Sequence, residues 1–175
     1  LVMVGYRNAS VLISDRGIIA PDGKTSDLGM IRLLEKVVAR TSGQNASQLA
    51  PAVVAAGYDI STTPLTKLLK SKKNVNKRHE LMQIQIAIQL ARSEYADVLT
   101  SWLDQVVPSN GVSEILFCGG TADYMRRELN SHHSGIPCLW GVGAQIPSQV
   151  DSFGLGSRLA DVYSVFLYFS QRIGN

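Results

Sequence analysis

An apolar stripe in the middle of the 175-residue chain is the feature that most limits how it can fold. Its positions are separated by alternating steps of three and four residues, a spacing that places side chains on one face of an α-helix. The stripe predicts one long helix from about Lys77 to Val107, which Pro108 stops. Apolar residues make up 45% of the chain, which is enough to build a sizeable core around it. The stripe consists of Leu81, Ile84, Ile88, Ala91, Tyr95, Val98 and Trp102.

The flanking segments alternate between strand and helix patterns. Short turns separate the first three apolar runs, so they should form an antiparallel meander. Later strands, each joined to the next by a helix, should be parallel to their neighbours. This order predicts an α/β fold of the ribonuclease-H-like type, with a mixed five-stranded sheet flanked by helices on both faces. The predicted strands are 1–6, 9–14, 17–20, 114–118 and 137–140, the predicted helices besides the long one are 28–42, 122–130 and 155–173, and 44–76 is predicted as a small helical insertion.

The hairpin over residues 2–8 is the first segment that could carry chemistry. The chain runs into Gly5 and turns back through Tyr6, Arg7 and Asn8. Backbone N–H groups of such a turn can face a phosphate. An ordinary β-hairpin is the alternative explanation.

A second candidate segment follows the strand over 114–118, where Gly119, Gly120 and Thr121 lead into a helix. Because glycine has no side chain, a ligand can approach the backbone there, and the start of a helix favours anionic or polar groups. Tight packing is the alternative explanation. A third segment, Gly23–Gly29, is predicted as a turn in which Thr25 or Ser26 caps the next helix.

Taken in order, these segments resemble the second lobe of the actin-like ATPases, and most closely the plasmid-partitioning filament proteins of the ParM/StbA type. That family has a phosphate-binding hairpin with the pattern Asp-x-Gly-x-x-Thr, which Met3–Asn8 matches in position. Its glycine-containing turn into a helix is similar to Gly23–Gly29, and its Gly-Gly segment at adenosine is similar to 114–122. A short motif at the start of its last helix is matched by Leu159–Val162.

The resemblance covers nearly all 175 residues and implies that the chain is a second lobe, with the first lobe outside this sequence. It implies a cytoplasmic parent protein that binds ATP and Mg²⁺ between two lobes, self-associates into filaments and positions DNA through a DNA-bound adaptor protein. The implied nucleotide-binding residues are Gly5, Tyr6, Arg7, Asn8, Gly119, Gly120, Thr121 and Asp161.

Departures from the family pattern bear on hydrolysis. The family's aspartate, which orients the attacking water, is replaced by Met3, and a thioether can neither bind Mg²⁺ nor accept a proton from water. Asn8 stands at the family's threonine position. No catalytic residue or metal ligand is therefore assigned, and a degenerate actin-like scaffold without ATP hydrolysis is the alternative function. A nuclease is excluded because the first strand lacks the carboxylates that two-metal chemistry needs.

The remaining features indicate surface or core roles. No apolar run is long enough to span a membrane, and Cys118 and Cys138 are expected to be reduced core thiols. His132 and His133 are expected at the surface, and Trp102 and Trp140 in the core. A basic run is expected to be a solvated part of the insertion, with a filament or DNA contact as the alternatives. The resemblance also permits Lys77, Arg78 or Glu80 near the ribose or adenine. This basic run consists of Lys67, Lys70, Lys72, Lys73, Lys77 and Arg78.

Overall fold

The computed structural model describes residues 1–16, 18–141, 146–152, 154, 156–159, 163 and 170. Five strands form the main sheet in the order β5-β2-β1-β6-β7. The central strand β1 is antiparallel to β2 and parallel to β6, and β6 is parallel to β7. This mixed order confirms the predicted ribonuclease-H-like sheet. The strand bounds are β1 Val2–Val4, β2 Ala9–Val11, β5 Lys24–Ser26, β6 Ile115–Cys118 and β7 Cys138–Trp140.

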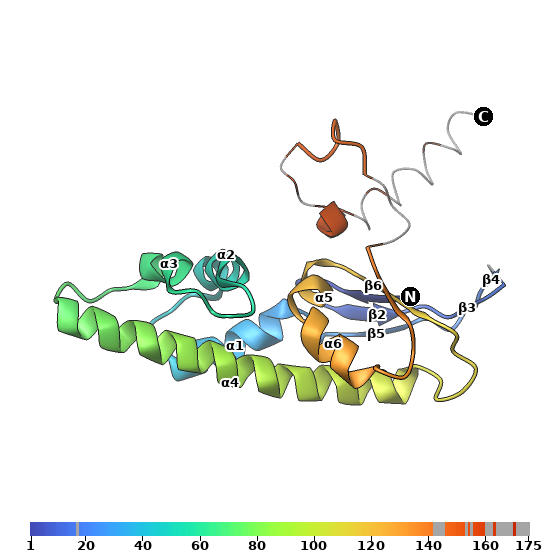
Figure 1. Cartoon of the computed structure of the whole chain (residues 1–175), viewed down its shortest axis with the longest axis horizontal. Helices are drawn as coiled ribbons and strands as arrows, with labels where there is room; N and C mark the ends of the chain where they lie inside the picture. Colours follow the sequence, from blue (N-terminus) through green and yellow to red (C-terminus); the bar gives the residue numbers. More distant parts are fainter. Residues whose placement is uncertain are drawn as a thin grey trace.

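The long helix α4 (Asn74–Val106) confirms the prediction from the apolar stripe. Figure 1 shows it running along one edge of the molecule, with α2 and α3 beside its N-terminal half and the sheet beside its C-terminal half. Helix α1 (Met30–Arg40) packs against it. The other helices are α2 (Ala46–Ala56), α3 (Thr62–Leu65), α5 (Gly120–Tyr124) and α6 (Arg126–His132), together with the 3₁₀ turns η1 (Thr66–Leu68) and η2 (Gly156–Leu159).

The third strand of the main sheet is not the predicted one. Residues 18–19 form β4 (Ile18–Ile19), which pairs with β3 (Ser14–Asp15) in a separate two-stranded sheet. The main sheet is instead completed by β5, which pairs with β2 and was predicted as a capping turn. Side chains of β5 are polar, as a sheet edge permits, and the Thr25 hydroxyl lies 3.0 Å from the Ser10 hydroxyl. An edge strand of this kind carries no apolar alternation by which its sequence would reveal it.

Two helix predictions also need correction. The helix expected over 122–130 is divided at Met125 into α5 and α6. Helix α1 has Gly29 as its N-cap and no side-chain cap, so neither Thr25 nor Ser26 caps it in the predicted way. The closing helix expected over 155–173 lies mostly outside the described residues.

The core lies between α1, α4 and the sheet. It includes Leu33 and Leu34 of α1, Tyr95 and Leu99 of α4, and Phe117 of β6. Side chains from the segment over 44–76 belong to the same apolar cluster, namely Leu49, Ala52, Val53, Ala56, Ile60, Leu65 and Leu68. Among the described residues, no helix is both long enough and apolar enough to cross a membrane.

The two adjacent histidines have different environments. His132 is exposed, as expected, and its Nε2 lies 2.7 Å from Asp104 Oδ1. His133 is not at the surface, since only 8% of it is exposed and its ring centroid lies 5.8 Å from that of Phe117. The adjacent Trp140 ring also stacks on Phe117, at 4.7 Å. The prediction that both histidines lie at the surface is therefore wrong for His133, although its sequence neighbours are polar.

Candidate functional site

The turn after β1 is held from two sides through one carbonyl group. Gly5 O accepts hydrogen bonds from the backbone N–H of Met30 at 3.1 Å and from the Thr121 hydroxyl at 2.8 Å. Gly5 N–H donates to Asn8 O at 2.9 Å and closes the turn itself. The hairpin tip is thus fixed to the start of α1 and to the start of α5.

Parallel pairing of β1 with β6 explains why two distant glycine segments meet. Both strands end at the same edge of the sheet, so Gly5 and Gly119 leave it side by side. Gly119 has φ +97°, and a Cβ at this position would overlap the carbonyl group of Val4. Glycine alone meets both conditions, the left-handed backbone and the close approach of the two chains. The Thr121 side chain then reaches Gly5 from a buried position, with 4% of the residue exposed.

A third glycine brings the start of α1 against the hairpin. A Cβ on Gly29 would overlap the backbone of Tyr6 and Arg7, so the chains touch there without an intervening side chain. Ile31 N–H donates to Tyr6 O at 3.0 Å, beside the bond from Met30 to Gly5. The segment predicted as a turn into the helix therefore serves as a backbone support for the hairpin tip.

The hairpin turn, the start of α1, helix α2 and the start of α5 line a solvent-open pocket of about 640 Å³. Half of its lining comes from the predicted binding residues Gly5, Tyr6, Gly119, Gly120 and Thr121. The other half was not predicted, and consists of Met30 and of Ala50, Pro51, Val54 and Ala55 on α2. These small apolar residues give no chemical signal in a sequence. They form a wall only because α2 and the hairpin turn line the same pocket.

The other predicted site residues are not among the residues that line this pocket. Arg7 and Asn8 are exposed on the hairpin tip, next to Tyr6, which does line it. Asp161 lies outside the described residues. The structure thus brings five of the predicted residues together and leaves Arg7 and Asn8 at the margin.

The described lining of the pocket consists of backbone groups and uncharged side chains, and it includes no charged side chain. None of its described lining residues carries a carboxylate, and no group of three or more His, Cys, Asp or Glu residues able to hold a metal occurs in the described part of the chain. Met3 is half-buried in β1, opposite Ser10 in β2 and Cys118 in β6. The site as described fits an uncharged or aromatic group, but it does not fit a Mg²⁺ ion bound directly by its described lining residues.

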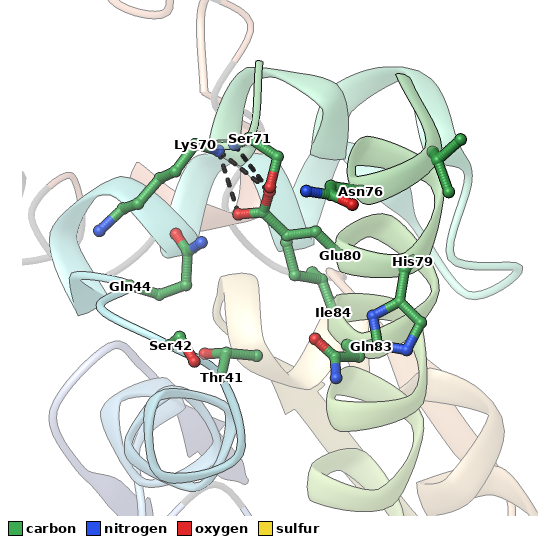
Figure 2. Close-up of a pocket in the computed structure, with 11 residues that line it drawn as sticks. Thr41, Ser42, Gln44, Lys70, Ser71, Asn76, His79, Glu80, Gln83 and Ile84 are labelled. Carbon is green, nitrogen blue, oxygen red and sulfur yellow. Dashed lines mark hydrogen bonds between the residues drawn. The ribbon is translucent and has the colours of Figure 1, made fainter. Parts of the chain in front are cut away.

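A separate hollow of about 570 Å³ lies where the end of α1 faces the start of α4 (Figure 2). One of its lining residues is Glu80, whose carboxylate accepts hydrogen bonds from the N–H groups of Lys70 and Ser71, each at 3.0 Å. The Lys70 bond, with smaller contributions from Ser71, lowers the pKa of Glu80 despite opposing desolvation. Glu80 therefore holds the loop before α4, and it lines this hollow and not the glycine-lined pocket. Lys77 and Arg78 are exposed and line neither of the two.

No family model and no curated protein matches the chain. Among solved structures, it is similar to component A of the (R)-2-hydroxyglutaryl-CoA dehydratase of Acidaminococcus fermentans, with a TM-score of 0.43 and 17% identity over 91% of this chain and 59% of that one. It is also similar to the activator of the 2-hydroxyisocaproyl-CoA dehydratase of Clostridium difficile, with bound ADPNP, with a TM-score of 0.42 and 14% identity over 97% of this chain and 62% of that one.

The chain therefore spans about three fifths of the length of these two proteins. Neither of their names describes a plasmid-partitioning or filament protein. At these scores the likeness shows neither a shared activity nor a shared partner.

Proposed function

We propose that this chain is the second lobe of an actin-like ATP-binding protein and that the nucleotide lies in the glycine-lined pocket. One observation carries the proposal. Thr121 Oγ1 donates to Gly5 O, and so joins the two glycine segments that the sequence separates most widely. Both segments also line the same hollow of about 640 Å³. A shared wall is what the resemblance requires of a phosphate hairpin and an adenosine segment.

In this arrangement the adenosine would lie against small side chains and bare backbone. Ala50, Val54 and Ala55 supply the apolar side, and Gly119 and Gly120 leave the backbone open to a flat ring. The phosphates would extend toward the hairpin tip, where the exposed Arg7 guanidinium can pair with them. Asn8 and Asp161 remain proposed members of the site on the resemblance alone.

Mg²⁺ would reach this lobe through the phosphate oxygens, because the described lining provides no carboxylate for it. Whether ATP is hydrolysed is a separate question from binding. Met3 supplies no general base, so this lobe would not orient an attacking water in the family manner. That observation favours the second candidate function, a nucleotide-binding or purely structural scaffold. Filament formation, a DNA-bound adaptor and a cytoplasmic location belong to the proposal for the parent protein and rest on the resemblance.

Isothermal titration of ATP into the chain, with and without Mg²⁺, tests the binding site. Ala55→Trp places a large ring in the pocket from an exposed position on α2, and we expect it to weaken binding about tenfold or more. Gln48→Trp is the matched control, since Gln48 is exposed on the same helix and outside the pocket lining. Equal affinities in both variants would place the nucleotide elsewhere. An absence of binding by the chain and by its parent protein would refute the proposal.

Phosphate release by the parent protein over a range of protein concentrations separates the two candidate functions. Turnover that rises steeply above a critical concentration would support a polymerising ATPase with its water-orienting group away from Met3. ATP binding without turnover would support the scaffold.

A further inference from the structure

Helix α4 carries apolar side chains on the face that points away from the core. Val75, Met82, Ile86 and Leu90 have exposed fractions of 81%, 51%, 48% and 49%. Steps of four or seven residues keep side chains on one side of a helix, so these four side chains lie within a band about a quarter of a turn wide. The set is named here the outer stripe. Aligned apolar residues on an exposed helix face are typical of a surface that meets another molecule.

The opposite face of α4 is already occupied. Buried residues such as Ile88, Tyr95 and Leu99 point into the core, and α1, α3 and α6 pack on the helix. No described element covers the outer stripe, and in Figure 1 the helix forms one whole edge of the molecule. With 33 residues, α4 is about 50 Å long, which gives a second helix ample room to pack alongside it.

Charges on the exposed surface of α4 separate along the helix. Lys77 and Arg78 lie near its start, whereas Glu94, Asp97 and Asp104 lie in its second half. Lys36 and Arg40 pair with Glu94, and His132 pairs with Asp104. In the described part of the chain, no ion pair is formed by Asp97, by Lys77 or by Arg78. At 3.6 residues per turn, Lys77 lies on the side of the helix away from the outer stripe. Arg78 and Asp97 lie on the stripe's side, before Met82 and beyond Leu90, and carry opposite charges.

We propose that the outer stripe is a self-association surface, on which α4 of a second copy of this chain packs antiparallel. A two-fold axis near Ile88 would place Ile86 of one copy beside Leu90 of the other. Arg78 and Asp97 lie at nearly equal separations from Ile88 along the helix, so each would come level with the opposite charge on the second copy, within reach of the long arginine side chain. A parallel pair would instead bring like charges together. The antiparallel choice therefore follows from charge complementarity.

The expected strength is modest. A single pair of helices with a short apolar centre buries less surface than a stable dimer requires, so a dissociation constant in the micromolar range or weaker, roughly 10 µM or above, is expected. Self-association through α4 does not depend on nucleotide, so the proposal stands or falls independently of ATP binding.

Sedimentation equilibrium of the whole chain over a concentration series tests the surface. The wild type should shift from monomer to dimer, and Ile86→Asp should remain monomeric, because it would bury a charge in the apolar centre. Val98→Asp is the control. Val98 is also 44% exposed on α4 but lies about a third of a turn from Ile86, so its variant should dimerise like the wild type. Thermal melts followed by circular dichroism would establish that both variants fold.

Charge exchange tests the antiparallel orientation. Asp97→Lys alone should weaken the dimer several-fold, and Asp97→Lys combined with Arg78→Glu in one chain should restore it. Failure of the double variant to recover would overturn the antiparallel pairing. A wild-type chain that stays monomeric up to about 500 µM would overturn the proposal and leave the stripe to another part of the parent protein or to a different protein. Equal dimerisation of Ile86→Asp and the wild type would also overturn it.

Discussion

Replacing Thr121 by valine tests whether the bond across the two glycine segments matters for the site. The substitution keeps the side-chain shape and removes the hydroxyl that donates to Gly5 O at 2.8 Å. Gly5 O keeps its second donor, the Met30 N–H at 3.1 Å, so it does not become an unpaired buried acceptor. The loss should therefore equal one net hydrogen bond, about 1 kcal/mol. Valine recovers part of it, because the site is buried and an added methyl group there is favourable.

We expect Thr121→Val to lower the free energy of unfolding by roughly 0.5–1 kcal/mol, or the melting temperature by roughly 1–4 °C. Urea unfolding followed by tryptophan fluorescence measures the first quantity. ATP affinity should fall more clearly, by about fivefold, since the hairpin tip loses the Thr121 side-chain bond that ties it to the start of α5. Thr121→Ser keeps the hydroxyl and should keep the affinity, although it loses a buried methyl group. Unchanged affinity in the valine variant, or equal losses in valine and serine, would refute the role of this bond.

Three further changes test other parts of the structure. Gly119→Ala should lower the free energy of unfolding by about 2 kcal/mol or more in thermal melts and abolish ATP binding, because φ is +97° and the added Cβ would overlap the Val4 carbonyl group. A mild effect would contradict the close approach of Gly119 to Val4. Burial lowers the pKa of His133 below 6.5 in the folded chain, so the unfolded chain binds a proton on this ring more tightly. The free energy of unfolding should therefore fall as the pH drops below about 6.5, and His133→Phe should flatten this part of a pH series of urea melts. Arg92→Leu should lower the free energy of unfolding by about 3 kcal/mol in the same melts, because Arg92 Nε lies 3.3 Å from Glu128 Oε1 in a largely buried pair. A variant as stable as the wild type would show that the Glu128 carboxylate is hydrated instead.

Much of the fold follows from strong periodicity in the sequence. The stripe from Leu81 to Trp102 predicts α4 to within three residues at its start and one at its end, because a long amphipathic pattern is hard to produce otherwise. Strand β5 could not be recognised in the same way. Lys24, Thr25 and Ser26 are polar residues at a sheet edge, and they are a strand only because Ala9–Val11 lies beside them. Pairing partners of this kind are not visible in a local pattern.

Part of the candidate site could likewise be predicted from the sequence, and part could not. Gly5 and Gly119 could be placed together from the sequence, since parallel neighbouring strands end at one edge of a sheet. The wall formed by Ala50, Val54 and Ala55 could not, because small apolar residues on a helix indicate only that it packs on something. His133 was placed wrongly for a related reason. Its polar neighbours suggest a surface turn, whereas contact with Phe117 decides its burial.

The central position of β1 has a consequence for how this chain can be synthesised safely. Strand β1 pairs on one side with β2, which follows within a few residues, and on the other with β6, which begins at Ile115. Until that second neighbour has emerged from the ribosome, one side of the central strand presents unpaired backbone groups, and such edges recruit other chains. Fragments that end before Ile115 should therefore aggregate through β1. Premature termination within α4 would leave β1 with this unpaired side exposed.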